Sequence, residues 1–273
     1  MKVALIQMNS GSDKAANLAM ARRLIEKAIA EESPDWISLP EVFDFMGGSR
    51  ADKMAAAETM PGGPAYTMLQ DLARTHGVFI HGGSMLEKID GEDRVGNTTV
   101  AFDRTGKEVA RYRKIHMFDI TTPDGQEYKE SKAYRPGDAV VTYECDDIII
   151  GCSICYDLRF PDLFAALADK GAELIALPAA FTLQTGKDHW EVLCRARAIE
   201  TETFFCAAGQ TGTHMQGNEV RATYGHSLVA DPWGHVVAKA SDGVGYVAAR
   251  IDTALIKKVR TMIPVAQHKV KLS

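Results

Sequence analysis

The stretch "IIIGCSICYDLRFP" (148–161) is the strongest indication of the fold, because an apolar run here leads into a polar turn and then a proline. Ile148, Ile150 and Cys152 follow the period of a buried strand. Cys155 comes just beyond that strand, before the helical pattern that starts near Pro161. A strand, a turn and a helix in this order are typical of an α/β fold.

The two cysteines of "CSIC" have three possible interpretations. A metal or redox pair is disfavoured, since Cys145, Cys194 and Cys206 offer no second pair at ligand spacing. Both thiols could instead be core residues, because cysteine is among the most buried residue types. Alternatively, Cys152 is a core residue and Cys155 is a nucleophile at the mouth of the strand-to-helix turn, where backbone N–H groups can face a reacting carbonyl.

Outward from this stretch, strand patterns alternate with helix patterns along the whole chain. This alternation predicts sheets covered by helices in a single α/β unit. Residues 116–138 form a long connection with little periodicity. Connections of this length without secondary structure are usually functional or disordered. The predicted strands are 2–8, 35–41, 78–87, two within 98–114, 147–154, 173–178, 204–209, 226–230, 235–240 and 245–251, and the predicted helices are 17–32, 63–77, 160–172, 189–202 and 253–264.

Composition excludes several classes of function. The 273 residues are 46% hydrophobic and 25% charged, with a formal net charge of −5, so there is no basic surface for nucleic acid. No segment has the roughly 20 apolar residues of a membrane span, and the first residues lack the apolar region of a signal peptide. Five cysteines do not indicate a disulfide framework. We therefore expect a cytoplasmic protein with no nucleic-acid or membrane partner.

Two further polar residues stand at the ends of predicted strands. Glu41 follows "SLP" directly, and Lys114 ends "RYRK". Ligands of α/β sheets gather beyond the carboxyl ends of strands, so these groups and Cys155 could meet at one site. Taken singly, most Glu and Lys side chains in such positions are simply solvated.

Together these motifs resemble the nitrilase superfamily of carbon–nitrogen hydrolases. The resemblance rests on "LPE" ending in Glu41, "YRKIHMFD" containing Lys114 and "CYDLRFP" starting at Cys155, and it extends over nearly the whole chain. It implies an α-β-β-α sandwich in one domain (1–273), a Glu41–Lys114–Cys155 triad, and a supporting carboxylate at Glu130 in "KES". It also implies a homodimer or higher homo-oligomer, and it calls for no cofactor or metal.

The chemistry of amide hydrolysis agrees with these residue types. An amide carbonyl is a poor electrophile, and covalent catalysis divides its hydrolysis into two easier steps. Glu41 would take the thiol proton, while Lys114 and the backbone N–H of Tyr156 would stabilise the developing oxyanion. A Cys–His arrangement with His116, His189 or His226 is the alternative, but no signal marks any of these histidines as the base.

The motifs resemble most closely the branch that hydrolyses deaminated glutathione. Omega-amidases acting on 2-oxoglutaramate or 2-oxosuccinamate are the alternative, followed by N-carbamoyl amino acid or nitrile hydrolases with the same triad. Arg159 would bind the substrate carboxylate, unless it forms an ion pair with Asp157 or Asp162. Phe181 and Thr182 would line the same cleft. If the protein is not an enzyme, the alternative function is an inactive binding module.

Overall fold

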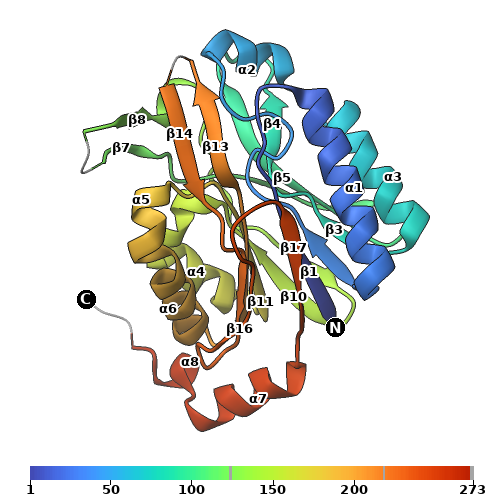
Figure 1. Ribbon diagram of the computed structural model, residues 1–273. Coiled ribbons are helices and arrows are strands. Elements are labelled where there is room, and N and C mark those ends of the chain that lie inside the picture. Colours follow the sequence, from blue (N-terminus) through green and yellow to red (C-terminus); the bar gives the residue numbers. More distant parts are fainter. Residues whose placement is uncertain (123–124, 218, 271–273) are drawn as a thin grey trace.

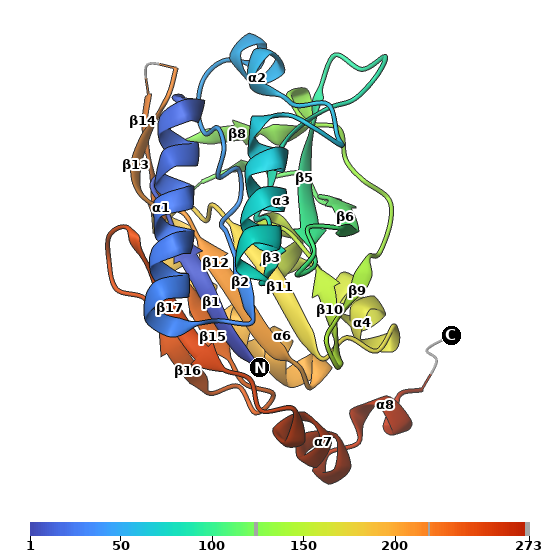
Figure 2. The ribbon, with the colours of Figure 1, turned by 90° about the vertical axis from the view of Figure 1, so that its right-hand side faces the viewer.

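The chain folds into two sheets that pack face to face, with a pair of helices on each outer side (Figures 1 and 2). We describe a computed structural model, which covers residues 1–122, 125–217 and 219–270. Four layers in this order form the α-β-β-α sandwich that the family resemblance implied. Among the described residues, no helix has both the length and the apolar composition needed to cross a membrane.

The first sheet has the order β17-β1-β2-β3-β5-β4, and β6 pairs with β5 at the side. Parallel pairing joins β1, β2 and β3, as expected for short apolar runs separated by helices. Helices α1 (Lys14–Glu32) and α3 (Pro64–His76) cover its outer face. The strands are β1 (Lys2–Gln7), β2 (Trp36–Ser38), β3 (Phe79–His81), β4 (Met85–Lys88), β5 (Val95–Phe102), β6 (Glu108–Arg113) and β17 (Gly245–Arg250).

The second sheet has the order β16-β15-β12-β11-β10-β9. Helices α4 (Pro161–Asp169) and α6 (Glu191–Thr201) cover its outer face. Gly151 lets α4 lie close, since a Cβ there would meet Leu167 at 3.2 Å. The strands are β9 (Thr142–Cys145), β10 (Ile148–Cys152), β11 (Leu174–Ala179), β12 (Phe204–Gly209), β15 (Leu228–Ala230) and β16 (Val236–Lys239).

The main core lies between the two sheets. Leu5 and Trp36 of the first sheet share one buried cluster with Ile150 and Leu174 of the second. Trp36 also donates an indole hydrogen bond of 2.8 Å to the Tyr143 hydroxyl across the interface. This shared core fixes one sheet against the other, so groups at the strand ends of both sheets hold defined relative positions.

Two hairpins extend beyond the sandwich at the end where β2 and β10 finish (Figure 1). They are β7 (Asp119–Thr121) with β8 (Glu127–Lys129), and β13 (Thr211–Gln216) with β14 (Glu219–Tyr224). The remaining elements are α2 (Arg50–Ala56), α5 (Leu183–Thr185), α7 (Thr253–Met262), α8 (Val265–His268), two 3-10 turns (Glu130–Lys132 and Cys155–Arg159) and a π-helical turn (Gly186–Trp190).

The structure differs from the sequence-based expectations at a few places. The single strand expected over 78–87 is two strands, β3 and β4, because Gly82 and Gly83 turn the chain between them. Gly83 has a φ of +57°, and a Cβ there would meet the Pro40 carbonyl oxygen at 2.2 Å. The segment 116–138 carries the β7–β8 hairpin, which its weak periodicity did not reveal.

Candidate active site

Three polar side chains meet where strands of the two sheets end. Glu41 follows β2, Lys114 follows β6 directly, and Cys155 follows β10. All three are buried, with exposed fractions of 4%, 1% and 7%. The structure therefore brings together the three strand-end residues named from the sequence: Lys114 donates to Glu41, and both charges act on the Cys155 thiol.

Lys114 lies between two carboxylates. Its ammonium donates to Glu41 Oε1 at 2.9 Å and to both oxygens of Glu130 at 2.9 Å. The backbone N–H of Phe118 donates to Glu130 as well, at 2.6 Å. The spacing of the sequence alone favoured a solvated loop carboxylate at Glu130. In the structure Glu130 holds the ammonium together with Glu41.

Glu41 is oriented by two donors that sequence reasoning missed. The Asn97 side-chain amide donates to Glu41 Oε1 at 2.8 Å and to Glu130 Oε1 at 3.4 Å. The backbone N–H of Ala180 donates to Glu41 Oε2 at 2.9 Å. The only available signal was an asparagine next to the apolar run of β5, and that residue lay just outside the predicted strand.

These charges shift the pKa values of the buried groups. Burial alone would lower the pKa of Lys114, but the negative charges of Glu130 and Glu41 outweigh it, so this pKa is well above its ordinary value. Burial raises the pKa of Glu130, and Lys114 counteracts part of that rise. Lys114 therefore stays an ammonium ion, able to donate hydrogen bonds to an anion that forms beside it.

Cys155 sits in a strained turn directly after β10. Its φ is +46°, in the left-handed region that side chains rarely adopt. Asp157 holds this turn, accepting from the Ile154 N–H at 2.8 Å and the Tyr112 hydroxyl at 2.6 Å. Strain of this kind is typical of functional positions, because the surrounding structure has to maintain it.

The two cysteines of "CSIC" have different surroundings. Cys152 is fully buried in β10, within the core between the sheets. Burial raises the pKa of the Cys155 thiol well above its usual range, the charge of Glu41 raises it further, and Lys114 opposes both effects. An uncharged thiol is thus the resting form of Cys155, and its activation calls for a base. Glu41 is the neighbouring carboxylate.

Tyr156 follows Cys155 within the 3-10 turn, and its side chain is half-buried. The first N–H groups of a helical turn have no partner inside that turn, so they can bind an external acceptor. The Tyr156 ring packs edge-on against Phe118 and Phe160, with centroid distances of 5.0 and 5.3 Å. These contacts fix the backbone next to the thiol.

The histidines of the Cys–His alternative have other partners. His116 Nδ1 lies 2.7 Å from Asp157 Oδ1, His189 Nδ1 lies 3.3 Å from Arg159, and His226 Nδ1 lies 2.8 Å from the Tyr224 carbonyl. None of these contacts links an imidazole to the Cys155 thiol, so they give no support to a histidine base.

The structure separates the three predicted substrate-binding residues. The Arg159 guanidinium lies over the Phe181 ring, 5.3 Å from its centroid, and Phe181 is buried. Within the described chain, Arg159 forms no salt bridge with Asp157 or Asp162, the alternative that the sequence left open. Thr182 lines the cavity described next, whereas Arg159 and Phe181 do not.

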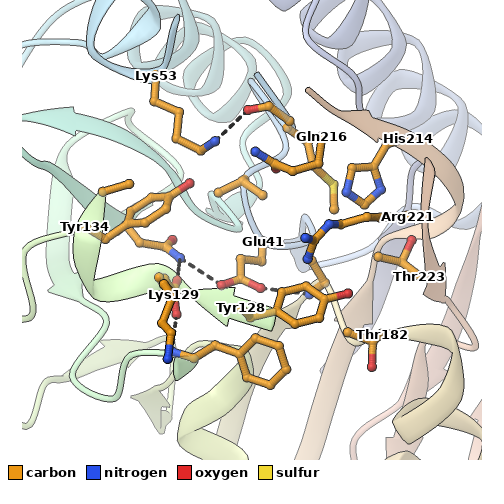
Figure 3. Close-up of a pocket in the computed structure, with 18 of the residues that line it drawn as sticks. Glu41, Lys53, Tyr128, Lys129, Tyr134, Thr182, His214, Gln216, Arg221 and Thr223 are labelled. Atoms are coloured by element: carbon orange, nitrogen blue, oxygen red, sulfur yellow. Dashed lines mark hydrogen bonds between the residues drawn. The ribbon is translucent and has the colours of Figure 1, made fainter. Parts of the chain in front are cut away.

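A cavity of about 270 Å³ opens beside Glu41 (Figure 3). Its inner wall includes Glu41, Asn97, Lys114 and Glu130, and Thr182 lies at its edge. Cys155 is not on its wall. The remaining lining residues come mainly from the loop after β2, the β7–β8 segment and the β13–β14 hairpin: Val42, Met46, Gly47, Lys53, Phe118, Glu127, Tyr128, Lys129, Ala133, Tyr134, Ala180, His214, Gln216, Arg221, Ala222 and Thr223.

Known proteins resemble this chain over almost its entire length. A family model described as carbon-nitrogen hydrolase matches residues 2–261. A protein of Synechocystis sp. (strain PCC 6803 / GT-S) named deaminated glutathione amidase is 38% identical, with 98% of this chain and 97% of that protein covered. The Homo sapiens protein of the same name is 39% identical, with coverages of 98% and 81%.

Solved structures agree with this assignment. The Caenorhabditis elegans NitFhit protein superimposes with a TM-score of 0.90 at 36% identity, over 98% of this chain and 64% of that longer one. Saccharomyces cerevisiae Nit3, described as a member of branch 10 of the nitrilase superfamily, gives a TM-score of 0.86 at 31% identity, with coverages of 97% and 94%. The chain thus belongs to the carbon–nitrogen hydrolase family, and it is a hydrolase of carbon–nitrogen bonds other than peptide bonds.

Proposed function

We propose that the protein hydrolyses deaminated glutathione, releasing 2-oxoglutarate and cysteinylglycine through a thioester on Cys155. The observation that carries this proposal is the Lys114 ammonium, held 2.9 Å from both Glu41 and Glu130 beside a strained cysteine. The relatives named deaminated glutathione amidase support the choice of substrate.

In the first half-reaction, Glu41 takes the proton of the Cys155 thiol, and the thiolate attacks the amide carbonyl carbon. The oxyanion that forms accepts hydrogen bonds from Lys114 and the Tyr156 N–H. Glu41 then gives its proton to the amide nitrogen, the C–N bond breaks, and the amine leaves. The acyl group remains on Cys155 as a thioester.

In the second half-reaction, Glu41 takes a proton from a water molecule, which attacks the thioester carbonyl. The same donors stabilise the second oxyanion. Collapse of this intermediate breaks the C–S bond, and the proton held by Glu41 returns to sulfur. Glu130 acts as a positioning residue, because its carboxylate holds Lys114 in place.

Arg159 remains our candidate for binding the carboxylate of the 2-oxo acid, with Phe181 beside its guanidinium, whereas Thr182 lines the neighbouring cavity. Its guanidinium has no acidic partner among the described residues, and it stands four positions after Cys155. A planar guanidinium suits a carboxylate, because two parallel hydrogen bonds can form.

We also propose that the whole chain is one catalytic domain that works as a homo-oligomer in the cytoplasm. Support for an oligomer comes from exposed apolar side chains on one surface: Val192 and Ile199 of α6 are 65% and 50% exposed, and Trp233 is 46% exposed. All five cysteines are free thiols, which suits a reducing compartment.

A substrate panel tests the proposed activity. We expect the highest kcat/KM with deaminated glutathione, followed by 2-oxoglutaramate, and lower values with N-carbamoyl amino acids and nitriles. A preference for 2-oxoglutaramate would indicate an omega-amidase, and a preference for carbamoyl compounds or nitriles would exclude the branch while keeping the triad. Failure to hydrolyse any amide would favour a binding module.

A further inference from the structure

The far end of the cavity carries positive charge that the proposed mechanism does not use. Figure 3 shows Lys53 and His214 above Glu41, with the Arg221 guanidinium between His214 and Tyr128. Lys53 belongs to α2, whereas His214 and Arg221 belong to the β13–β14 hairpin, where they are paired across the two strands. Two cations, Lys53 and Arg221, thus line one end of the cavity together with His214, whose pKa is lowered to about 4 by burial and by the charges of Arg221 and Lys53.

Lys53 is a buried ammonium without a carboxylate partner. It is 8% exposed and donates to the carbonyl oxygens of Gly47 and Gly48 at 2.7 and 3.1 Å. Within the described part of the chain it forms no salt bridge. Burial lowers the pKa of Lys53, the charge of Asp52 opposes this effect, and the charge of Arg221 adds to it. An anion bound at this position would offset both the cost of burying the ammonium and its repulsion from Arg221.

Arg221 and His214 retain unused buried hydrogen-bonding atoms. Arg221 Nε and His214 Nδ1 are inaccessible to solvent and have no hydrogen-bond partner among the described residues. The other edge of the guanidinium is engaged, because one Arg221 nitrogen donates to Glu219 at 2.8 Å and to the Glu127 carbonyl at 3.3 Å. A buried donor without a partner costs free energy, and a bound acceptor would recover it once these side chains turn toward the cavity.

The position of Glu41 indicates which part of a substrate reaches this end. Glu41 lines the cavity, and in the proposed mechanism it gives its proton to the leaving nitrogen. Cys155, which holds the acyl carbon, and Tyr156 do not line it, whereas Lys114, the other oxyanion donor, does. The group attached to the nitrogen, next to Glu41, is therefore the part of the substrate that extends into the cavity.

We propose that Lys53, His214 and Arg221 form a carboxylate-binding subsite for the amine half of the substrate. This inference rests on the proposed function and extends it: the preferred amides carry a terminal carboxylate on the leaving group. In deaminated glutathione that carboxylate belongs to the glycine, two residues from the scissile nitrogen, a reach of roughly 7 Å at about 3.5 Å per residue. The subsite thus selects peptide-like amides over primary amides.

The test compares deaminated glutathione with its C-terminal carboxamide, which differs only at the glycine carboxylate. The wild-type enzyme should prefer the acid by about 10–100-fold in kcat/KM, mostly through KM, because a carboxylate far from the reacting carbon contributes equally to the ground state and the transition state. Arg221→Gln and Lys53→Met should each reduce this preference by about tenfold or more. Arg23→Gln, an exposed residue of α1, is the matched control and should keep the full preference.

Each outcome separates the inference from the proposed function. Equal wild-type kcat/KM values for the acid and the carboxamide would overturn the subsite while leaving the amidase activity intact. Equal losses on both compounds in Arg221→Gln and Lys53→Met would place these residues at the 2-oxo acid or in the fold, and would also overturn it. Hydrolysis of neither compound by the wild-type enzyme would overturn the proposed function itself.

Discussion

At the scale of single residues, the site depends on a buried cation placed between two buried carboxylates. We expect Lys114→Met to lower kcat by about 10²–10³, because the oxyanion loses a charged donor. The variant should also be less stable by about 3–5 kcal/mol, since Glu41 and Glu130 are left facing each other. Steady-state kinetics and urea unfolding measure the two effects, with the exposed Lys107→Met as control. A kcat within threefold of the wild type would contradict the role of Lys114.

Asp44 gives a second test at this scale, through the pH dependence of stability. Burial raises its pKa from 3.8 to about 6, although Lys14 opposes the rise. Because the folded-state value lies above the unfolded one, Asp44 stabilises the fold when protonated, and that contribution is lost as the pH rises from about 4 through 6. A shift of this size corresponds to about 3 kcal/mol.

The Asp44→Asn variant should therefore gain stability relative to the wild type, by about 3 kcal/mol, between pH 4 and pH 7. Chemical unfolding of both proteins at several pH values provides the measurement. The exposed Asp90→Asn should run parallel to the wild type. A difference between Asp44→Asn and the wild type that does not change with pH would refute the assigned shift.

At the scale of elements, the 3-10 turn after β10 presents the thiol, and Asp157 maintains that turn. Asp157→Asn replaces one acceptor oxygen by a donor. The loss falls either on Oδ2, which accepts from both the Ile154 N–H and the Tyr112 hydroxyl, or on Oδ1, which accepts from the His116 N–H. We expect kcat to fall about 10–100-fold with little change in KM, because the nucleophile is misplaced while the cavity is intact. The free energy of unfolding should drop by about 1–3 kcal/mol.

Asp162→Asn, an exposed substitution in the adjoining helix, is the control for that turn. A rise in KM with unchanged kcat in Asp157→Asn would show that Asp157 shapes the cavity rather than the nucleophile.

Sequence patterns predicted those elements whose own residues determine them. β12 was predicted at its observed bounds, since "FFCAAG" is a continuous apolar run buried between a parallel neighbour, β11, and an antiparallel neighbour, β15. The β13–β14 hairpin was missed because its strands are largely exposed and depend on tertiary contacts, such as the Gln216 amide donating to the Gly48 carbonyl at 2.6 Å.

The same distinction applies to the site. Glu41, Lys114 and Cys155 stand at strand ends, so position and motif together identified them. Asn97 and Lys53 act through neighbours that are distant in sequence, and nothing local marks them. Arg221 belongs to the missed hairpin. The charged far end of the cavity consequently became visible only in the folded chain.

At the scale of the whole molecule, the exposed apolar surface of α6 predicts assembly. Gly234 lies against this surface, since a Cβ there would meet Ile199 at 2.5 Å, which places the Trp233 turn beside α6. Light scattering should give a wild-type mass of at least two chains. The double variant Val192→Glu/Ile199→Glu should have a lower mass, whereas Val244→Glu, on another exposed segment, should not. A monomeric wild-type protein would refute the proposal.

The central claim is that the amide is cleaved through a thioester on Cys155, and peptide mapping of enzyme acid-quenched within the first turnover tests it most directly. With deaminated glutathione, we predict that one equivalent of cysteinylglycine is released as the peptide containing Cys155 gains the mass of one 2-oxoglutaryl group, while the peptide segment carrying Cys152 shows no modification at that thiol. An acyl group on a different side chain, or release of 2-oxoglutarate at the wild-type rate by Cys155→Ala, would contradict the mechanism.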